Sequence, residues 1–132
     1  SGGAPPVPLF RVLALFRQTE LFDHWYPRCV EARTLATPGA CERLFRIVIE
    51  VRIPVIGKVS YDLMLHAYGV DALGTHGGFL ICGRSPRQLD WLKVPFPPPP
   101  KGGVRQDLAA LRLFITPLPG GRTHASICTA ID

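Results

Sequence analysis

The spacing of apolar residues changes once along the chain, from a helical period to a strand period. Between Pro8 and Pro27, apolar side chains recur every three or four residues, which predicts one helix over residues 9–22. Beyond Pro27, apolar residues alternate with polar ones or form short compact runs, which is typical of strands. Six strands are therefore expected, at residues 30–35, 42–52, 59–67, 79–83, 104–116 and 122–131.

The connections between the predicted strands are mostly short, so we expect neighbouring strands to be antiparallel. One helix followed by about six antiparallel strands predicts an α+β fold, a curved sheet with a helix covering one end. Residues 1–8 are linker-like, and residues 9–132 form the single expected domain. Two connections are longer: a glycine-rich loop over residues 68–78, and an irregular stretch over residues 85–103 that contains four consecutive prolines.

The composition predicts a folded chain with a substantial core. Of the 132 residues, 47 % are hydrophobic, and the mean hydropathy is +0.19. No apolar run is long enough for a transmembrane helix. The net charge of +5 suits an anionic partner, and it is equally typical of a GC-rich coding bias. The arginines are scattered rather than clustered, so we expect no nucleic-acid partner.

The chain carries no recognisable motif of a catalytic or metal site. Its four cysteines have neither C-x-x-C spacing nor histidines at zinc-ligand spacing, so we expect no metal and no cofactor. We expect these cysteines to be small buried residues in a reducing, intracellular compartment. His66 with Asp71, and His124 with Ser126, are the weak candidates for a general-base pair. No nucleophile motif accompanies them, so we expect the protein not to be an enzyme.

Four segments, in order along the chain, resemble the motifs of one known domain family. The predicted helix running into Trp25-Tyr26-Pro27 resembles a helix that ends in a W-x-P step. The stretch from Ile53-Pro54-Val55 to residues 61–65 (YDLML) resembles a P-V…R-D-F-V-x-L entry into a strand. Residues 100–105 (PKGGVR) resemble P-x-K-G-x-V-R, and residues 115–123 (ITPLPGGRT) resemble I-x-P-L-x-G-G-K-T. In this order, and spanning most of the chain from about residue 9 to residue 132, the four segments resemble the START lipid-transfer domain of the helix-grip superfamily.

The resemblance implies a helix-grip sheet around a cavity for one hydrophobic molecule, such as a sterol or a phospholipid. Compared with the family, this chain is expected to be truncated at both ends. The family's long C-terminal helix, which closes the cavity, would begin after Asp132. Without that helix an apolar concave face would be uncovered, which soluble monomers avoid. Where the family often has a cavity arginine, this chain has Leu65-His66-Ala67-Tyr68, so His66 or Tyr68 would contact the polar end of the ligand.

The strand alternation and the resemblance together indicate a set of ligand-binding residues. The expected set is Phe45, Ile47, Ile49, Tyr61, Leu63, Leu65, His66 and Tyr68. Residues 68–78 stand where the family has a gating loop, and Val70 and Leu73 are the side chains expected to meet a membrane or a closing helix. The alternative that the apolar residues simply pack against a helix and leave no cavity stays open.

The function expected from these observations is non-catalytic binding of a hydrophobic ligand in a START-like cavity, with lipid transfer as its use. The expected partners are a lipid or similar small molecule, a membrane surface, and proteins of a larger assembly. One alternative is an accessory subunit of such an assembly, whose partner covers the concave face. A polyketide-cyclase-like enzyme is the other alternative.

Overall fold

The computed structural model of the chain describes residues 8–86, 97–99 and 101–131. The helical segments are α1 (Leu9–Arg17), the 3-10 turn η1 (Thr19–Leu21), α2 (Phe22–Trp25) and α3 (Leu73–His76). The strands are β1 (Cys29–Gly39), β2 (Glu42–Ile53), β3 (Gly57–Ala72), β4 (Gly78–Arg84), β5 (Val104–Gln106), β6 (Leu108–Leu118) and β7 (Arg122–Ile131). The α+β prediction is therefore confirmed.

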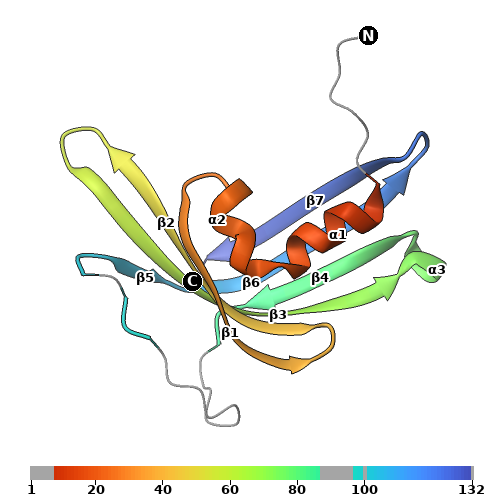
Figure 1. Cartoon of the computed structure of the whole chain (residues 1–132), viewed down its shortest axis with the longest axis horizontal. Helices are drawn as coiled ribbons and strands as arrows, with labels where there is room; N and C mark the ends of the chain where they lie inside the picture. The colour runs from red at the N-terminus through yellow and green to blue at the C-terminus, as the bar shows by residue number, and fades with distance from the viewer. Residues whose placement is uncertain (1–7, 87–96, 100, 132) are drawn as a thin grey trace.

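The seven strands form one curved, unclosed sheet, and α1 lies across its concave side (Figure 1). The sheet order is β1-β2-β3-β4-β6-β7, and every neighbouring pair on this path is antiparallel. The short strand β5 lies off the path and pairs in parallel with β3. Within the described residues, β1 and β7 are the edges of the path.

The single strand expected at residues 104–116 is in fact two strands, β5 and β6, separated at Asp107. The reason is that two strands, β4 and β5, pair with the edge of the long strand β3 that faces away from β2. Its residues Tyr61–Leu63 pair with β5, and its residues His66–Ala72 pair with β4. After β5 the chain therefore stops pairing with β3, and the next strand, β6, pairs with β4. The alternation of apolar and polar residues does not predict this change of partner.

The helix expected over residues 9–22 is interrupted at Gln18, whose ψ of 71° is not helical. The following residue, Thr19, is almost fully buried, and its hydroxyl is hydrogen-bonded to the Thr34 hydroxyl on β1. This tertiary contact ties the end of α1 to the sheet, and the chain resumes as η1 and α2. The break thus sets the position of α1 over the concave face.

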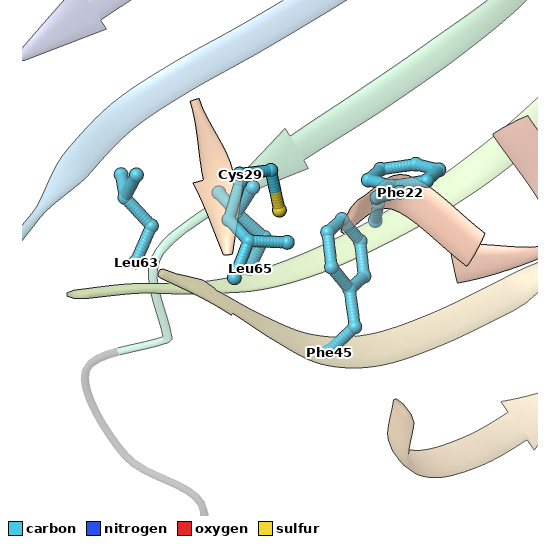
Figure 2. Packing of buried hydrophobic residues seen from close by; sticks show 7 residues of the cluster. Phe22, Cys29, Phe45, Leu63 and Leu65 are labelled. Carbon is cyan, nitrogen blue, oxygen red and sulfur yellow. The ribbon is translucent and has the colours of Figure 1, made fainter. Parts of the chain in front are cut away.

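Two apolar clusters join the helical segments to the concave face of the sheet. The larger one brings Phe22 of α2 against Phe45 of β2, with ring centroids 5.9 Å apart, and includes Cys29, Leu63 and Leu65 (Figure 2). The smaller one packs Leu9, Leu113 and Ile115. The edge-to-face contact between Phe22 and Phe45 stabilises the larger cluster beyond the burial of the two rings. The clusters hold α1 and α2 over opposite parts of the sheet.

A charged network occupies the other, convex face. Asp62 on β3 is fully buried, and its carboxylate accepts hydrogen bonds from Arg46 Nε (2.9 Å) and Arg105 Nη2 (2.6 Å). Arg46 also donates to the Pro98 carbonyl (3.2 Å), and Arg105 donates to the Pro97 carbonyl. Buried charges require such pairing. Asp62 and Arg105 belong to two of the segments that resemble the START family, residues 61–65 and 100–105. Their contact therefore stabilises the fold.

Candidate functional site

A cavity of about 500 Å³ lies between the helical segments and the concave face of the sheet. This volume falls within the range of about 300–1,000 Å³ that is usual for small-molecule sites. Residues of α1, η1, α2, β2, β3, β4, β6 and β7 line it, and most of them are apolar. Strand β7, which contributes Ile127 and Thr129 to the lining, is exposed along nearly its whole length.

Small residues at the floor of the sheet make room for the cavity. One cross-strand row on the concave face runs Arg43, Ala67, Gly83, Leu111 and Thr129. A Cβ added at Gly83 would lie 3.2 Å from the Ala67 Cβ. Larger side chains therefore do not fit at both position 67 and position 83. The cavity therefore lies above the smallest side chains of the sheet and is walled by the larger ones.

Polar groups occupy the rim at the turn between β1 and β2. The Cys41 carbonyl accepts a hydrogen bond from Gly69 N (2.8 Å), which holds this turn against β3. Arg43 Nη1 donates to the Thr37 hydroxyl (3.1 Å), and the exposed Arg17 at the end of α1 is also a lining residue. The cavity thus combines an apolar interior with a rim that can contact a polar group.

Two ionisable groups near the cavity have shifted pKa values. A hydrogen bond from the Thr34 hydroxyl, with a further contribution from the nearby Arg43 charge, lowers the pKa of Glu20. Burial raises the pKa of the Cys29 thiol, because the charged thiolate is poorly solvated in the core. Both shifts are ordinary consequences of local surroundings, and neither residue lines the cavity.

Searches for related proteins give a match at the level of fold. No protein-family model matches the sequence, and no curated protein is similar to it. A solved STAR-related lipid transfer protein from Xanthomonas axonopodis is 15 % identical with a TM-score of 0.70, over 97 % of this chain and 64 % of that chain. Human STARD10 is 16 % identical with a TM-score of 0.73, over 96 % of this chain and 47 % of that chain.

The lipid transfer and protein localization domain of human StarD13 (DLC2) is 17 % identical with a TM-score of 0.68, over 98 % of this chain and 58 % of that chain. The chain has a START-like fold. The match confirms the architecture that the four sequence segments indicated. The START-like domain described here spans about half to two thirds of the length of these three chains.

Most of the apolar residues expected to bind a ligand line the cavity. Phe45, Ile47 and Ile49 do so from β2, and Leu63 and Leu65 do so from β3. Tyr68 is 49 % exposed and lies at the rim. The alternative of a sheet packed without any cavity is therefore wrong for this START-like domain.

Two of the expected residues lie elsewhere. His66 is on the opposite face of β3 from Leu65, because side chains alternate along a strand, and its Nε2 is 2.5 Å from Glu42 Oε1. Tyr61 lies two residues beyond Leu63 toward the β2–β3 turn and is outside the cavity lining. The expectation that His66 contacts the polar end of a ligand does not fit this geometry.

The gating loop expected over residues 68–78 is much shorter in the structure. Strand β3 continues to Ala72, and Val70 pairs with Leu80 of β4. Leu73 begins α3 and packs, half-buried, against the smaller apolar cluster rather than extending into solvent. Two of the glycines that suggested a loop, Gly69 and Gly78, lie in strands under aromatic rings: a Cβ at Gly78 would lie 2.6 Å from the Phe114 ring. Gly77 ends α3 with a φ of 71°, which favours glycine.

Sequence reasoning missed the lining contributed by α1, β6, β7 and the two rim arginines. Arg43 follows the same alternation as Phe45 and could have been assigned to the concave face. Cys41 is exposed at the rim and Cys128 is exposed on β7, so the expectation of four buried cysteines is wrong for both. Arg17 lines the cavity because the break at Gln18 sets the position of α1. No local sequence pattern predicts that break.

Metal-binding clusters, membrane-spanning helices and one candidate base pair can be examined among the described residues. Within residues 8–86, 97–99 and 101–131, no group of three or more His, Cys, Asp or Glu side chains is arranged to hold a metal ion. No helix in this part of the chain is long and apolar enough to cross a membrane. The two residues of the candidate base pair contact other groups: His66 Nε2 lies 2.5 Å from Glu42 Oε1, and Asp71 Oδ1 accepts a hydrogen bond from the Leu73 backbone N–H.

Proposed function

We propose that this START-like domain binds one lipid or similar hydrophobic molecule in the cavity above Ala67, without catalysing a reaction. The observation that carries the proposal is an apolar cavity of about 500 Å³ between α1 and the sheet. Burial of apolar surface yields about 25 cal/mol per Å², so a cavity of this kind favours a molecule with a long or rigid apolar body. Two of the structurally similar proteins are named for lipid transfer, which supports the same function.

The test is a binding measurement on a variant that fills the cavity. In Ala67→Phe, an aromatic ring would occupy the floor of the cavity, so we expect the affinity for a fluorescent sterol or fatty acid to fall at least tenfold. Ala130→Phe makes the same chemical change at an exposed position on β7 that does not line the cavity, and it should bind as the unmodified protein does. Equal binding by the two variants would place the ligand elsewhere and overturn the proposal.

We also propose that the domain contacts a membrane surface through the β2–β3 turn, which lies at the end of β2 opposite the β1–β2 rim of the cavity. This hairpin projects at one end of the sheet (Figure 1), with Val55 fully exposed and Ile56 73 % exposed at its tip. Val55 adopts a φ of 73°, unusual for a β-branched residue. Arg52 and Lys58 flank the tip, and Lys58 is ion-paired with Glu50 (3.1 Å), so the apolar tip and the Arg52 charge are the features that suit an anionic bilayer.

Sedimentation with vesicles of phosphatidylcholine and phosphatidylserine tests this contact. Replacing both Val55 and Ile56 with serine should reduce the bound fraction severalfold. Leu118→Ser, at the exposed β6–β7 turn, is the matched control and should leave the bound fraction unchanged. If the bound fraction falls equally in both variants, vesicle binding does not depend specifically on the β2–β3 hairpin, and the proposed contact is wrong.

The accessory-subunit function remains the second candidate, because the concave side of β7 is uncovered within the described residues. Ile127 is 60 % exposed there and Ile131 is 68 % exposed. Native mass spectrometry of the protein from its own source separates the two functions. A small molecule bound one to one supports the lipid-binding domain, whereas an empty chain found only with other subunits supports the assembly.

A further inference from the structure

The charged residues that line the cavity are of one sign. Among the described lining residues, the charged ones are Arg17 on α1 and Arg43 on β2, and no carboxylate belongs to the lining. Neither arginine is within ion-pair distance of a carboxylate among the described residues, whereas Arg46 and Arg105 on the convex face are paired with Asp62. The cavity therefore presents positive charge that the fold itself leaves largely uncompensated.

The two arginines reach the cavity from elements that the fold ties together. The Thr19–Thr34 hydrogen bond fixes the end of α1, just after Arg17, against β1. Strand β1 pairs with β2, which carries Arg43 on its concave face two residues before Phe45. Both guanidinium groups therefore belong to the side of the cavity nearest the β1–β2 hairpin, next to apolar side chains that would surround a hydrocarbon tail.

The polar contacts of Arg43 leave N–H donors available for a ligand. Its Nη1 donates to the neutral Thr37 hydroxyl, and its charge acts at longer range on Glu20, whose carboxylate is hydrogen-bonded to Thr34. A guanidinium carries five N–H donors arranged as a fork that matches a carboxylate or a phosphate. Arg17 is exposed, so it can move toward a head group at the rim.

We infer that the cavity selects a lipid with one anionic head group, a carboxylate or a phosphate, over a neutral lipid of the same chain. The apolar tail would enter between Phe45 and Leu111, and the head group would remain at the rim between Arg17 and Arg43. The charge stays near water there, so binding avoids the large cost of burying an ion. This inference rests on the proposed function and specifies its ligand class.

The experiment compares ligands that share one hydrocarbon chain. Oleate, oleoyl lysophosphatidic acid and oleyl alcohol compete with a neutral fluorescent sterol for the purified protein near physiological ionic strength. The double variant Arg17→Gln/Arg43→Gln removes both rim charges. Arg11→Gln/Arg33→Gln is the matched control, because it removes the same net charge from two exposed positions on α1 and β1 that do not line the cavity.

We expect at least one of the two anionic lipids to bind about tenfold more tightly than oleyl alcohol, since charge-assisted hydrogen bonds are roughly twice as strong as neutral ones. The Arg17/Arg43 variant should lose this preference while its affinity for oleyl alcohol stays the same, and the control should keep it. Preference for oleate alone assigns the rim to carboxylates, and preference for lysophosphatidic acid alone assigns it to phosphates.

The failures of the two proposals are distinguishable. If the alcohol and both anionic lipids bind equally well, the cavity binds lipids without selecting charge, so the inference is wrong and the proposed function stands. If the preference survives in Arg17→Gln/Arg43→Gln, other residues cause it and the inference is equally wrong. If neither the sterol nor any oleyl compound binds, both the inference and the proposed function fail. The comparison of ligands on the unmodified protein requires no variant to fold.

Discussion

Replacing Asp62 with asparagine tests the physical role of the charged network on the convex face. Asp62 has no exposed surface, and it is the shared counterion of Arg46, whose side chain is 10 % exposed, and Arg105, whose side chain is 28 % exposed. Asparagine has nearly the same size and keeps hydrogen-bonding atoms, so the change removes charge rather than volume. It leaves two buried or half-buried guanidinium groups without their common counterion.

The expected cost follows from the burial of the three groups. Removing one partner of a buried ion pair generally costs about 3–5 kcal/mol, because the remaining charge is buried and unpaired. Arg105 retains some contact with water, and Arg46 has a second carboxylate, Glu31 Oε1, at 3.5 Å. Both features reduce the penalty, so we expect Asp62→Asn to lower the free energy of unfolding by about 3 kcal/mol. Domains are stable by only about 5–15 kcal/mol, so this loss is large.

Urea unfolding followed by tryptophan fluorescence measures the effect, because Trp25 lies in the aromatic cluster of the core. Asp107→Asn, at an exposed position between β5 and β6, is the control and should change stability by less than about 0.5 kcal/mol. A loss below about 1 kcal/mol for Asp62→Asn, at an unchanged denaturant slope, would refute the role assigned to the network. Lipid affinity of the folded variant should be nearly unchanged, because Asp62 does not line the cavity.

Three further predictions concern the concave side and its rim. Phe45→Ala should lower the free energy of unfolding by about 3 kcal/mol in urea, because this ring is 5 % exposed and packs on Phe22; a loss below about 1 kcal/mol would contradict that packing. Titration by NMR should find the pKa of Glu20 below its ordinary value, and removal of the hydroxyl in Thr34→Val should raise it. The stability that this carboxylate contributes is present above the ordinary pKa and lost as the pH falls through the lowered one, so an unshifted pKa would count against the contact. A thiol reagent should label the exposed Cys41 quickly and the buried Cys29 slowly, since burial raises the pKa of the Cys29 thiol; bound lipid should protect Cys41, and equal rates for both cysteines would be the contrary result.

Strand alternation was sufficient to find much of the cavity wall. Phe45, Ile47 and Ile49 share one face of β2 in any register, so their common direction follows from the pleat alone. The same rule excludes His66 from the face that carries Leu65, and applying it strictly would have removed His66 from the expected site. The misassigned loop at residues 68–78 has a different origin, because Gly69 and Gly78 reflect close packing of β3 and β4 under aromatic rings, and Gly77 reflects the left-handed end of α3.

The fold class, the alternating faces of the strands and the apolar character of the concave side can be predicted from the amino-acid sequence, because they depend on short-range periodicity. Asp62 and Arg105 also lie within segments of recognisable pattern, although 43 positions separate them. Contacts in the folded chain are needed to show that these two residues bind each other, that residues 104–118 divide between two neighbouring strands, and that α1 ends where Thr19 meets Thr34. The cavity and its two rim arginines belong to this second group. Their geometry arises from contacts between segments distant along the chain, and no local pattern of residues specifies the space that is left between them.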